Sequence, residues 1–247
     1  EAFELASQVV AEPISDGELQ LAERALARLS RHLGLPAQKR TKAPTPARLD
    51  LQLPRAPLLA VEQMVQLHLQ RSEAPVHYVE NTLICSLFGL LCWPAIFAAI
   101  PGAFFHPFQH GPADLLTADF YPRRRALFAE CLAQLDDQRY RDSIRQAYRD
   151  KFGIQSPFVH WGVLSETLLE QALDCLPAAH LQAWFRRLLG DIQANRSGMP
   201  DLIQFWPEEK RYRMIEVKGP GDRLQDNQRR WLAFCAEHDM PVDVCYV

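Results

Sequence analysis

The chain has 247 residues, of which 48% are hydrophobic and 23% charged, and its formal net charge is −3. This composition is typical of a folded globular protein and excludes an intrinsically disordered chain. The net charge excludes a surface that is basic all over, but it allows a local basic track beside an acidic pocket.

The six cysteines are scattered among apolar neighbours, and no two of them form a Cys-x-x-Cys pair. This spacing disfavours a zinc cage or a disulfide framework and favours buried, reduced thiols. No basic-then-apolar leader opens the chain, and its first residue is not methionine. We therefore expect an intracellular protein, in the cytoplasm or nucleoid of a bacterium or the nucleus of a eukaryote, and a fragment of a longer chain.

Residues 1–33 are expected to form a hairpin of two helices. Ser15 and Glu18 have the spacing of a capping box, in which two side chains satisfy free backbone amides at the start of a helix. Apolar residues then recur at helical spacing over 19–29. Because such a hairpin cannot bury its apolar face alone, we interpret it as the end of a helical, repeat-like region.

Residues 34–57 carry five prolines and five basic residues without a helical period. We expect a Pro-rich basic linker or an ordered extended connection here. Its charge fits either contact with nucleic acid or simple solvation, and the sequence leaves both open. The remaining residues, 58–247, would form the main domain.

A helix is expected from Leu58, and a second one is expected to begin near His77 or Glu80. Glu80 is the last acidic residue before an uncharged segment, 81–113. Judged by its position alone, this carboxylate is more typical of the first turn of a helix than of an active site.

The uncharged segment comes close to the ~20 apolar residues that a membrane-spanning helix requires. Pro94, Pro101 and Gly102 interrupt it, and histidines follow. We therefore expect buried helices that turn at the prolines, and no membrane association.

Helices are expected next over 122–135 and 137–152. In the second one, three arginines spaced by four residues share one face: Arg141, Arg145 and Arg149. Such a face can follow a phosphate backbone or be merely solvated, because nearby aspartates dilute its charge. Two further helices, over 163–175 and 178–195, lead to the closing segment.

The closing segment changes to strand periodicity. Strands are predicted over 201–206 and 212–217, joined by a turn, and a helix over 224–238 and a strand over 242–247 follow. Alternate side chains of a strand share a face, so Glu216 and Lys218 point together while Val217 points into the opposite layer. If the hairpin register brings Asp201 opposite, two carboxylates and an ammonium group meet in one pocket.

A pocket of this kind is suited to a divalent cation. Two carboxylates ~4 Å apart repel each other by about 4 kcal/mol at an effective dielectric constant near 20, and a cation relieves that repulsion. Oxygen ligands from Asp201, Glu216 and the carbonyl of Val217 suit one or two Mg²⁺ or Mn²⁺ ions. A bound cation activates water and polarises a phosphodiester, and Lys218 would orient the water or neutralise charge.

The residues after Lys218 supply further candidates. Gln228 would hydrogen-bond the nucleophile or a phosphate, and Arg223 would contact a phosphate. An acid followed about fifteen residues later by Glu-x-Lys is a weak pattern by itself, but the predicted strands on both sides strengthen it.

The stretches GMPDL and IEVKGPGDRLQDNQRRW resemble the VRR-Nuc (virus-type replication-repair nuclease) domain of the PD-(D/E)XK superfamily. HYVENTLICSLFGLLCWPAIF and PGAFFHPFQHGPADLL resemble segments of the Fanconi-associated nuclease family, so the likeness covers about residues 58–247. It implies an α/β fold with a restriction-endonuclease-like core, in which helices flank a mixed sheet, with additional helices and an N-terminal helical segment. It also implies that Glu80, Asp201 and Glu216 bind the metal and that Lys218 is the catalytic lysine.

By the same resemblance the chain would be a metal-dependent, structure-selective DNA nuclease. It would act as a 5′-flap endonuclease and 5′-to-3′ exonuclease in interstrand crosslink repair, on branched or flapped DNA and without an organic cofactor. Two positions depart from the family pattern: Pro94 stands where an acid is expected, and Asn81 stands where eukaryotic members tend to have glycine. The alternatives are a dimeric Holliday-junction-type resolvase and a helical interaction scaffold with a silent nuclease fold; protein partners cannot be inferred.

Overall fold

The computed structural model describes residues 1–36, 46–54, 56 and 58–247. The chain divides into two compact units, Glu1–Thr45 and Pro46–Val247. The boundary falls inside the segment predicted to be a linker. Of its five basic residues only Arg48 is described, and the choice between nucleic-acid contact and simple solvation for the other four lies outside the described residues.

The first unit contains the predicted helical hairpin, α1 (Ala2–Ala11) and α2 (Asp16–His32). The Ser15 hydroxyl accepts a hydrogen bond from the Glu18 backbone N–H at 3.2 Å, as the capping-box spacing predicts. The Glu18 carboxylate accepts instead from the N–H of Ile14 at 2.7 Å, one residue earlier than in the standard motif. Its place at the end of a repeat-like region stays a prediction.

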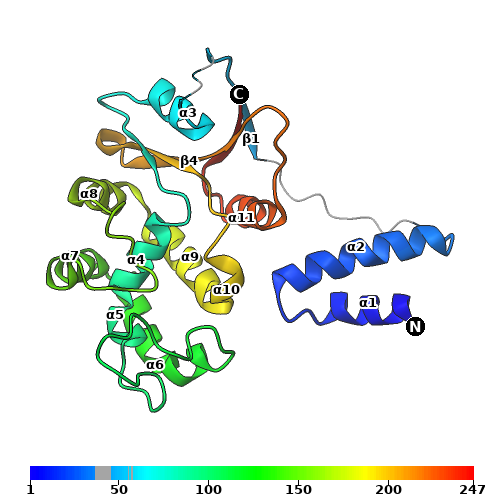
Figure 1. The fold of residues 1–247 in the computed structure, drawn as a ribbon, viewed down its shortest axis with the longest axis horizontal. Helices are drawn as coiled ribbons and strands as arrows, with labels where there is room; N and C mark the ends of the chain where they lie inside the picture. Colours follow the sequence, from blue (N-terminus) through cyan, green and yellow to red (C-terminus); the bar gives the residue numbers. More distant parts are fainter. Residues whose placement is uncertain (37–45, 55, 57) are drawn as a thin grey trace. The chain divides into compact units, whose positions relative to one another are not determined.

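The second unit is built on a five-stranded sheet of order β1-β5-β4-β3-β2 (Figure 1). Strand β4 runs parallel to β5 and antiparallel to β3, while β1 is parallel to β5 and β2 is antiparallel to β3. The sheet is therefore mixed, which confirms the predicted fold class. The strands are β1 (Ala47–Asp50), β2 (Val76–Tyr78), β3 (Leu202–Trp206), β4 (Arg211–Lys218) and β5 (Val242–Tyr246).

Helices cover both faces of the sheet. Because alternate side chains of a strand point to opposite faces, a separate hydrophobic core forms on each face. Leu202 and Ile215 are register partners and pack with Val65 of α3 (Val61–Leu69). The next pair, Ile203 and Met214, points the other way into the larger core. In Figure 1 helix α3 lies on one side of the sheet and α11 (Asp226–Glu237) on the other.

The larger core is mostly helical. Helix α4 (Leu83–Leu91) is buried at every residue, which explains the long uncharged segment of the sequence. Pro94 lies in the first turn of α5 (Trp93–Ile96), where its missing N–H costs no hydrogen bond. The other helices of this core are α6 (Phe120–Ala133), α7 (Tyr140–Lys151), α8 (Glu166–Cys175), α9 (Ala178–Gly190) and α10 (Ile192–Asn195).

Within the described ranges every helix is too short or too polar to reach across a lipid bilayer. The six cysteines are buried and free of disulfides, in agreement with the sequence analysis. Helix α6 begins two residues before the predicted start, and the predicted helix over 178–195 is split into α9 and α10 at Asp191, which caps the second helix.

Two strands were not predicted. Ala47–Asp50 lies in the proposed linker but pairs with β5 as an edge strand, and Leu49 packs into the smaller core. Val76–Tyr78 was assigned to the start of a helix, but it pairs with β3. Three residues are too few to show a period, so the adjoining apolar run dominated that prediction.

Candidate active site

The ends of β3 and β4 bring together the acids and the lysine of the closing segment. Because Leu202 pairs with Ile215, the preceding Asp201 lies beside Glu216 across the hairpin. The carboxylate of Asp201 accepts a hydrogen bond from the backbone N–H of Val217 at 2.7 Å. The Nζ of Lys218 donates to Oε1 of Glu216 at 2.6 Å. The hairpin thus has the register that the sequence left as a condition, and Glu216 and Lys218 share a face as predicted.

Asp201 is fixed from both sides of its strand. Its backbone carbonyl accepts a hydrogen bond from the N–H of Val79 at 2.9 Å, while its carboxylate is bound to β4. This contact places the end of β2, and the Glu80 that follows it, next to the β3–β4 hairpin. A residue far upstream in the sequence is thus tied to the closing segment through Asp201.

Glu80 lies in a turn between β2 and α4 and not at the start of a helix, which corrects the sequence-based placement. The hydroxyl of Tyr78 donates to Oε2 of Glu80 at 2.5 Å, and the side-chain amide of Asn81 donates to Oε1 at 3.2 Å. Asn81 also accepts a hydrogen bond from the Met199 N–H at 3.0 Å. Asn81 therefore links the Glu80 turn to the loop that precedes Asp201.

The backbone of Asn81 explains the departure noted at this position. Its φ angle is +55°, in the left-handed region where glycine is unstrained and asparagine is the side chain most readily tolerated. A family in which this position is often glycine fits the same turn. Asparagine adds the two hydrogen bonds that glycine cannot make.

The two acids of the hairpin are buried and their charges are poorly compensated. Glu216 has no exposed surface, and Asp201 is 6% exposed. Burial raises the pKa of Glu216 to about 7, and the nearby charges of Asp201 and Glu80 add to the rise against the effect of Lys218. Burial likewise raises the pKa of Asp201 to about 6, although the Val217 N–H and Lys218 oppose the rise.

These residues fit a hard divalent cation by their chemistry. Oε2 of Glu216 is buried with no hydrogen-bond partner, which is costly unless a positive group binds it. The donors are carboxylate oxygens, the ligands that Mg²⁺ and Mn²⁺ prefer. In the described parts of the chain, however, no three His, Cys, Asp or Glu side chains already lie close enough together to hold one ion. Ligation by Glu80, Asp201, Glu216 and the Val217 carbonyl therefore stays a prediction.

The predicted phosphate-contact residues have varied surroundings. The Gln228 side chain accepts a hydrogen bond from the Gln225 N–H at 2.9 Å and so caps α11, while Arg223 is exposed. On α7, Arg145 pairs with Glu170 at 2.7 Å and Arg141 lies 3.6 Å from Asp174. Arg149 is exposed and contacts Gln146.

Helix α11 approaches the site closely at Gly198. A Cβ atom on Gly198 would lie 2.8 Å from the backbone carbon of Asn227, and its φ angle is +89°. This contact holds the start of α11, including Gln228, against the loop that leads to Asp201.

Sequence reasoning missed three residues near the site. Tyr78 and Asn81 flank the turn that holds Glu80, and their roles depend on a strand and a turn that the sequence did not reveal. Glu62, in the first turn of α3, lies close enough to raise the pKa of both Asp201 and Tyr78. Only the spacing of Tyr78 and Glu80, two residues apart where an extended segment ends, was a usable signal.

Comparison of the chain with known proteins places it among a group of DNA nucleases. Residues 135–247 match the VRR-NUC domain. Over its full length the chain is 65% identical to the Fanconi-associated nuclease 1 homolog of Pseudomonas aeruginosa and covers 44% of that protein. The chain belongs to the Fanconi-associated nuclease family. The VRR-NUC match includes Asp201, Glu216 and Lys218 but begins after Glu80.

Other members of the family are also similar to this chain in sequence or structure. Human Fanconi-associated nuclease 1 is 32% identical over 78% of this chain and 20% of its own length. The crystal structure of paFAN1 bound to 2nt 5′flap DNA with gap has a TM-score of 0.95 and 64% identity, over 99% of this chain and 45% of that one. The chain thus spans less than half the length of these relatives. The predicted bounds of the VRR-Nuc-like domain, 58–247, extend beyond the matched residues.

Proposed function

We propose that this chain is the catalytic part of a metal-dependent, structure-selective DNA nuclease. It acts inside the cell as a 5′-flap endonuclease and 5′-to-3′ exonuclease in interstrand crosslink repair. The observation that supports this function best is the buried meeting of Asp201, Glu216 and Lys218 at the ends of two paired strands. The two paFAN1 structures, bound to 1nt and 2nt 5′flap DNA, support the choice of substrate.

In this proposal the carboxylates of Glu80, Asp201 and Glu216 and the carbonyl of Val217 hold one or two Mg²⁺ or Mn²⁺ ions. The bound cation supplies an activated water and stabilises negative charge on the phosphodiester. The Val217 N–H binds one carboxylate oxygen of Asp201, which would leave the other oxygen to bind the cation. The Tyr78 hydroxyl and the Asn81 amide orient Glu80.

Lys218 has two roles in the proposed reaction. Without DNA its ammonium group is bound to Oε1 of Glu216 and offsets part of the charge of the buried acids. With DNA in place, it neutralises charge that develops on the attacked phosphate, which requires only rotation of its flexible stem. Arg223, Gln228 and the arginines of α7 would contact phosphates outside the scissile position.

Cleavage of a labelled 5′-flap substrate tests this function. We expect the protein to cut with Mn²⁺ or Mg²⁺, and EDTA to stop the reaction. Lys218→Ala should lower the rate by about 100-fold or more, the usual effect of removing a group that stabilises transition-state charge. Lys210→Asn is a matched control, because Lys210 is exposed in the hairpin turn at a φ angle of +50° that asparagine tolerates.

Two results would contradict the assignment. Robust cleavage by Lys218→Ala would exclude the proposed catalytic lysine. A folded wild-type protein without metal-dependent cleavage of any branched DNA would favour the interaction scaffold.

A further inference from the structure

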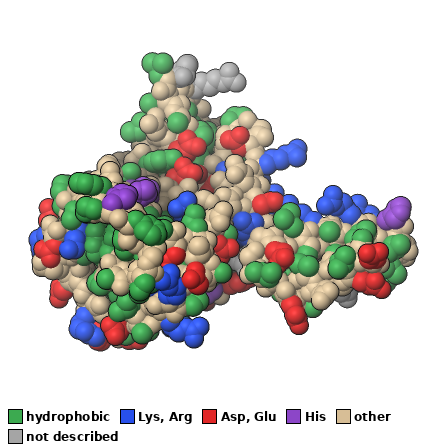
Figure 2. Space-filling model, turned by 60° about the horizontal axis from the view of Figure 1, so that its bottom comes forward, with side chains coloured by type: hydrophobic (Ala, Val, Ile, Leu, Met, Phe, Trp, Pro, Cys, Tyr) green, Lys and Arg blue, Asp and Glu red, His purple; other side chains and the backbone are tan. Residues whose placement is uncertain are grey.

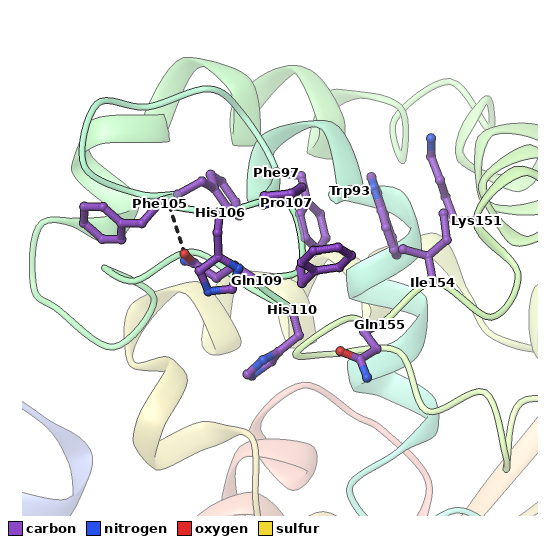
Figure 3. Close-up of a pocket in the computed structure, with 12 residues that line it drawn as sticks. Trp93, Phe97, Phe105, His106, Pro107, Gln109, His110, Lys151, Ile154 and Gln155 are labelled. Atoms are coloured by element: carbon purple, nitrogen blue, oxygen red, sulfur yellow. Dashed lines mark hydrogen bonds between the residues drawn. The ribbon is translucent and has the colours of Figure 1, made fainter.

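A hollow of about 910 Å³ lies at the far end of α4 and α5 from the Glu80 turn. It is formed by the loop 104–110 on one side and by Lys151, Ile154 and Gln155 at the end of α7 on the other (Figure 3). None of the residues of the candidate active site lines it. On the face of the molecule shown in Figure 2, histidine side chains lie among hydrophobic side chains.

Aromatic rings dominate the lining of this hollow. Trp93 and Phe97 stack with their centroids 4.5 Å apart and their planes at 24°, and Phe104 continues the series at 6.0 Å and 22°. Two more rings lie on the loop and are largely open to solvent, with Phe105 75% and Phe108 87% exposed. Exposed rings beside a stacked series can accept further flat, aromatic groups.

The loop that presents these rings is tied down by its own hydrogen bonds. The side-chain amide of Gln109 donates to the carbonyls of Ala103 and Gly111, each at 2.7 Å, and accepts from the Phe105 N–H at 3.1 Å. The Ala113 N–H donates to the Ala103 carbonyl at 2.8 Å and so closes the base of the loop. The backbone that carries the exposed phenylalanines is therefore held in its conformation by the loop itself.

The charges of the hollow select the type of partner. No carboxylate lines it, whereas Lys151, His106 and His110 do. In the described part of the chain no carboxylate pairs with Lys151, which distinguishes it from Arg145 on the same helix. A neutral-to-basic hollow with open aromatic rings matches a ligand that is anionic and also carries flat rings.

We infer that this hollow binds unpaired bases of single-stranded DNA. Proteins hold single strands by stacking bases on aromatic side chains beside cationic groups that meet the phosphates. Phe105 and Phe108 would stack the bases, and Lys151 would meet the backbone. The inference rests on the proposed function, which supplies a DNA substrate with an unpaired strand.

Helix α4 lies in the chain between the Glu80 turn and the residues that line the hollow. Its nine residues, at 1.5 Å per residue, span roughly 13 Å. One strand of a duplex advances ~3.4 Å per nucleotide, and an unpaired strand can extend further, so a few nucleotides cover the length of this helix.

Binding measurements without cleavage test the inference. Fluorescence anisotropy would compare a ten-nucleotide oligo-dT strand with a blunt duplex, in EDTA, using the 247-residue chain. The double variant Phe105→Ala/Phe108→Ala should weaken binding of the single strand by about 25-fold or more, because two stacked bases are lost and each contributes about fivefold or more. Binding of the duplex should change less than twofold. Both rings are exposed, so circular dichroism should show an unchanged fold.

Phe152→Ala is the matched control, because Phe152 is also an exposed phenylalanine, at 63%, but does not line the hollow. It should leave binding of the single strand unchanged. In addition, a strand with 5-iodouracil should crosslink to the peptide that contains residues 93–110.

The inference is overturned if the double variant binds the single strand as the wild type does, or if the crosslinks lie only elsewhere. It is also overturned if the double variant changes only self-association in analytical ultracentrifugation, which would make the hollow a contact between copies. Failure of the proposed nuclease function would give a different result. In that case the wild type would cleave no substrate, whatever the effect of the double variant on binding of the single strand.

Discussion

The Nζ atom of Lys218 lies 2.6 Å from Oε1 of Glu216, and yet the pKa of this glutamate is raised to about 7. Burial and two neighbouring carboxylates outweigh the single ammonium group. Without a cation these carboxyl groups therefore retain their protons to a higher pH than free carboxyl groups do.

The first prediction concerns stability against pH in the absence of metal. The pKa of Asp201 rises from 3.8 to about 6 and that of Glu216 from 4.5 to about 7. A raised pKa means that the folded chain retains protons which the unfolded chain releases, so this contribution is present at low pH and is lost as the pH rises through the folded pKa. Each shift corresponds to a free energy on the order of 3 kcal/mol.

We therefore expect urea unfolding in EDTA to show lower stability at pH 8 than at pH 5. Glu216→Gln should reduce this difference, because the amide has no charge to bury. Asp142→Asn, at a side chain 92% exposed, should leave it unchanged. Equal pH dependence in wild type and Glu216→Gln would show that the buried acid is not responsible.

The second prediction concerns added metal. A cation that binds only the folded chain stabilises it and so raises the melting temperature. The stabilisation is about 2.7 kcal/mol when the free cation concentration is a hundred times its dissociation constant. The rise with Mn²⁺ should be larger at pH 8 than at pH 5, because the ligands must be deprotonated. Differential scanning fluorimetry measures it, with Glu216→Gln as the variant that should lose the effect. A rise of the same size in that variant would place the cation elsewhere.

The third prediction concerns Gly198. Gly198→Ala should destabilise the protein by about 2 kcal/mol or more, because the new Cβ collides with the backbone of Asn227 at a positive φ angle. Gly102→Ala is the control, since its φ angle is also positive, +79°, but its Cβ would meet open space. It should cost only the strain of about 1 kcal/mol. Denaturant unfolding measures the free energy of unfolding of both variants. Equal losses of stability in Gly198→Ala and Gly102→Ala would show that the close contact with Asn227 has no effect.

The fourth prediction separates the two properties of Asn81. Asn81→Gly removes two hydrogen bonds at a cost of about 2 kcal/mol in total, whereas Asn81→Ala adds the strain of the left-handed conformation, about 1 kcal/mol more. Cleavage should fall by a similar factor, about tenfold, in both variants, because both leave Glu80 without its amide donor. If cleavage instead follows the order of stability, Asn81 acts only on the fold.

The sequence alone predicted the hairpin and the shared face of Glu216 and Lys218 because the signals were local. Glu216 and Lys218 share a face through simple alternation, and both strands have apolar runs bounded by turn residues. The position of Asp201 opposite Glu216 was left conditional on the hairpin register, which the structure supplies. Helices α6 to α9 and α11 were also predicted with small shifts at their ends, because their apolar periods are long.

What the sequence could not supply depends on distant pairing. Strand β1 is recognisable only beside β5, and β2 only beside β3. Since the Glu80 turn follows β2, its hydrogen bonds with Tyr78 and Asn81 were invisible as well. The importance of Glu80 came from family resemblance and not from its local pattern, and its role as a metal ligand is still a prediction.

The hydrogen bond between Asn81 and Met199 joins residues 118 positions apart in the chain. Closing so long a loop costs entropy that only later contacts repay, so such pairings form late in folding. Glu80 must accordingly remain apart from the acids and the lysine of the hairpin until β2 has paired with β3. A partly folded chain, newly synthesised or partly denatured, would carry the hairpin without Glu80, and the complete cluster would exist only in the fully folded molecule.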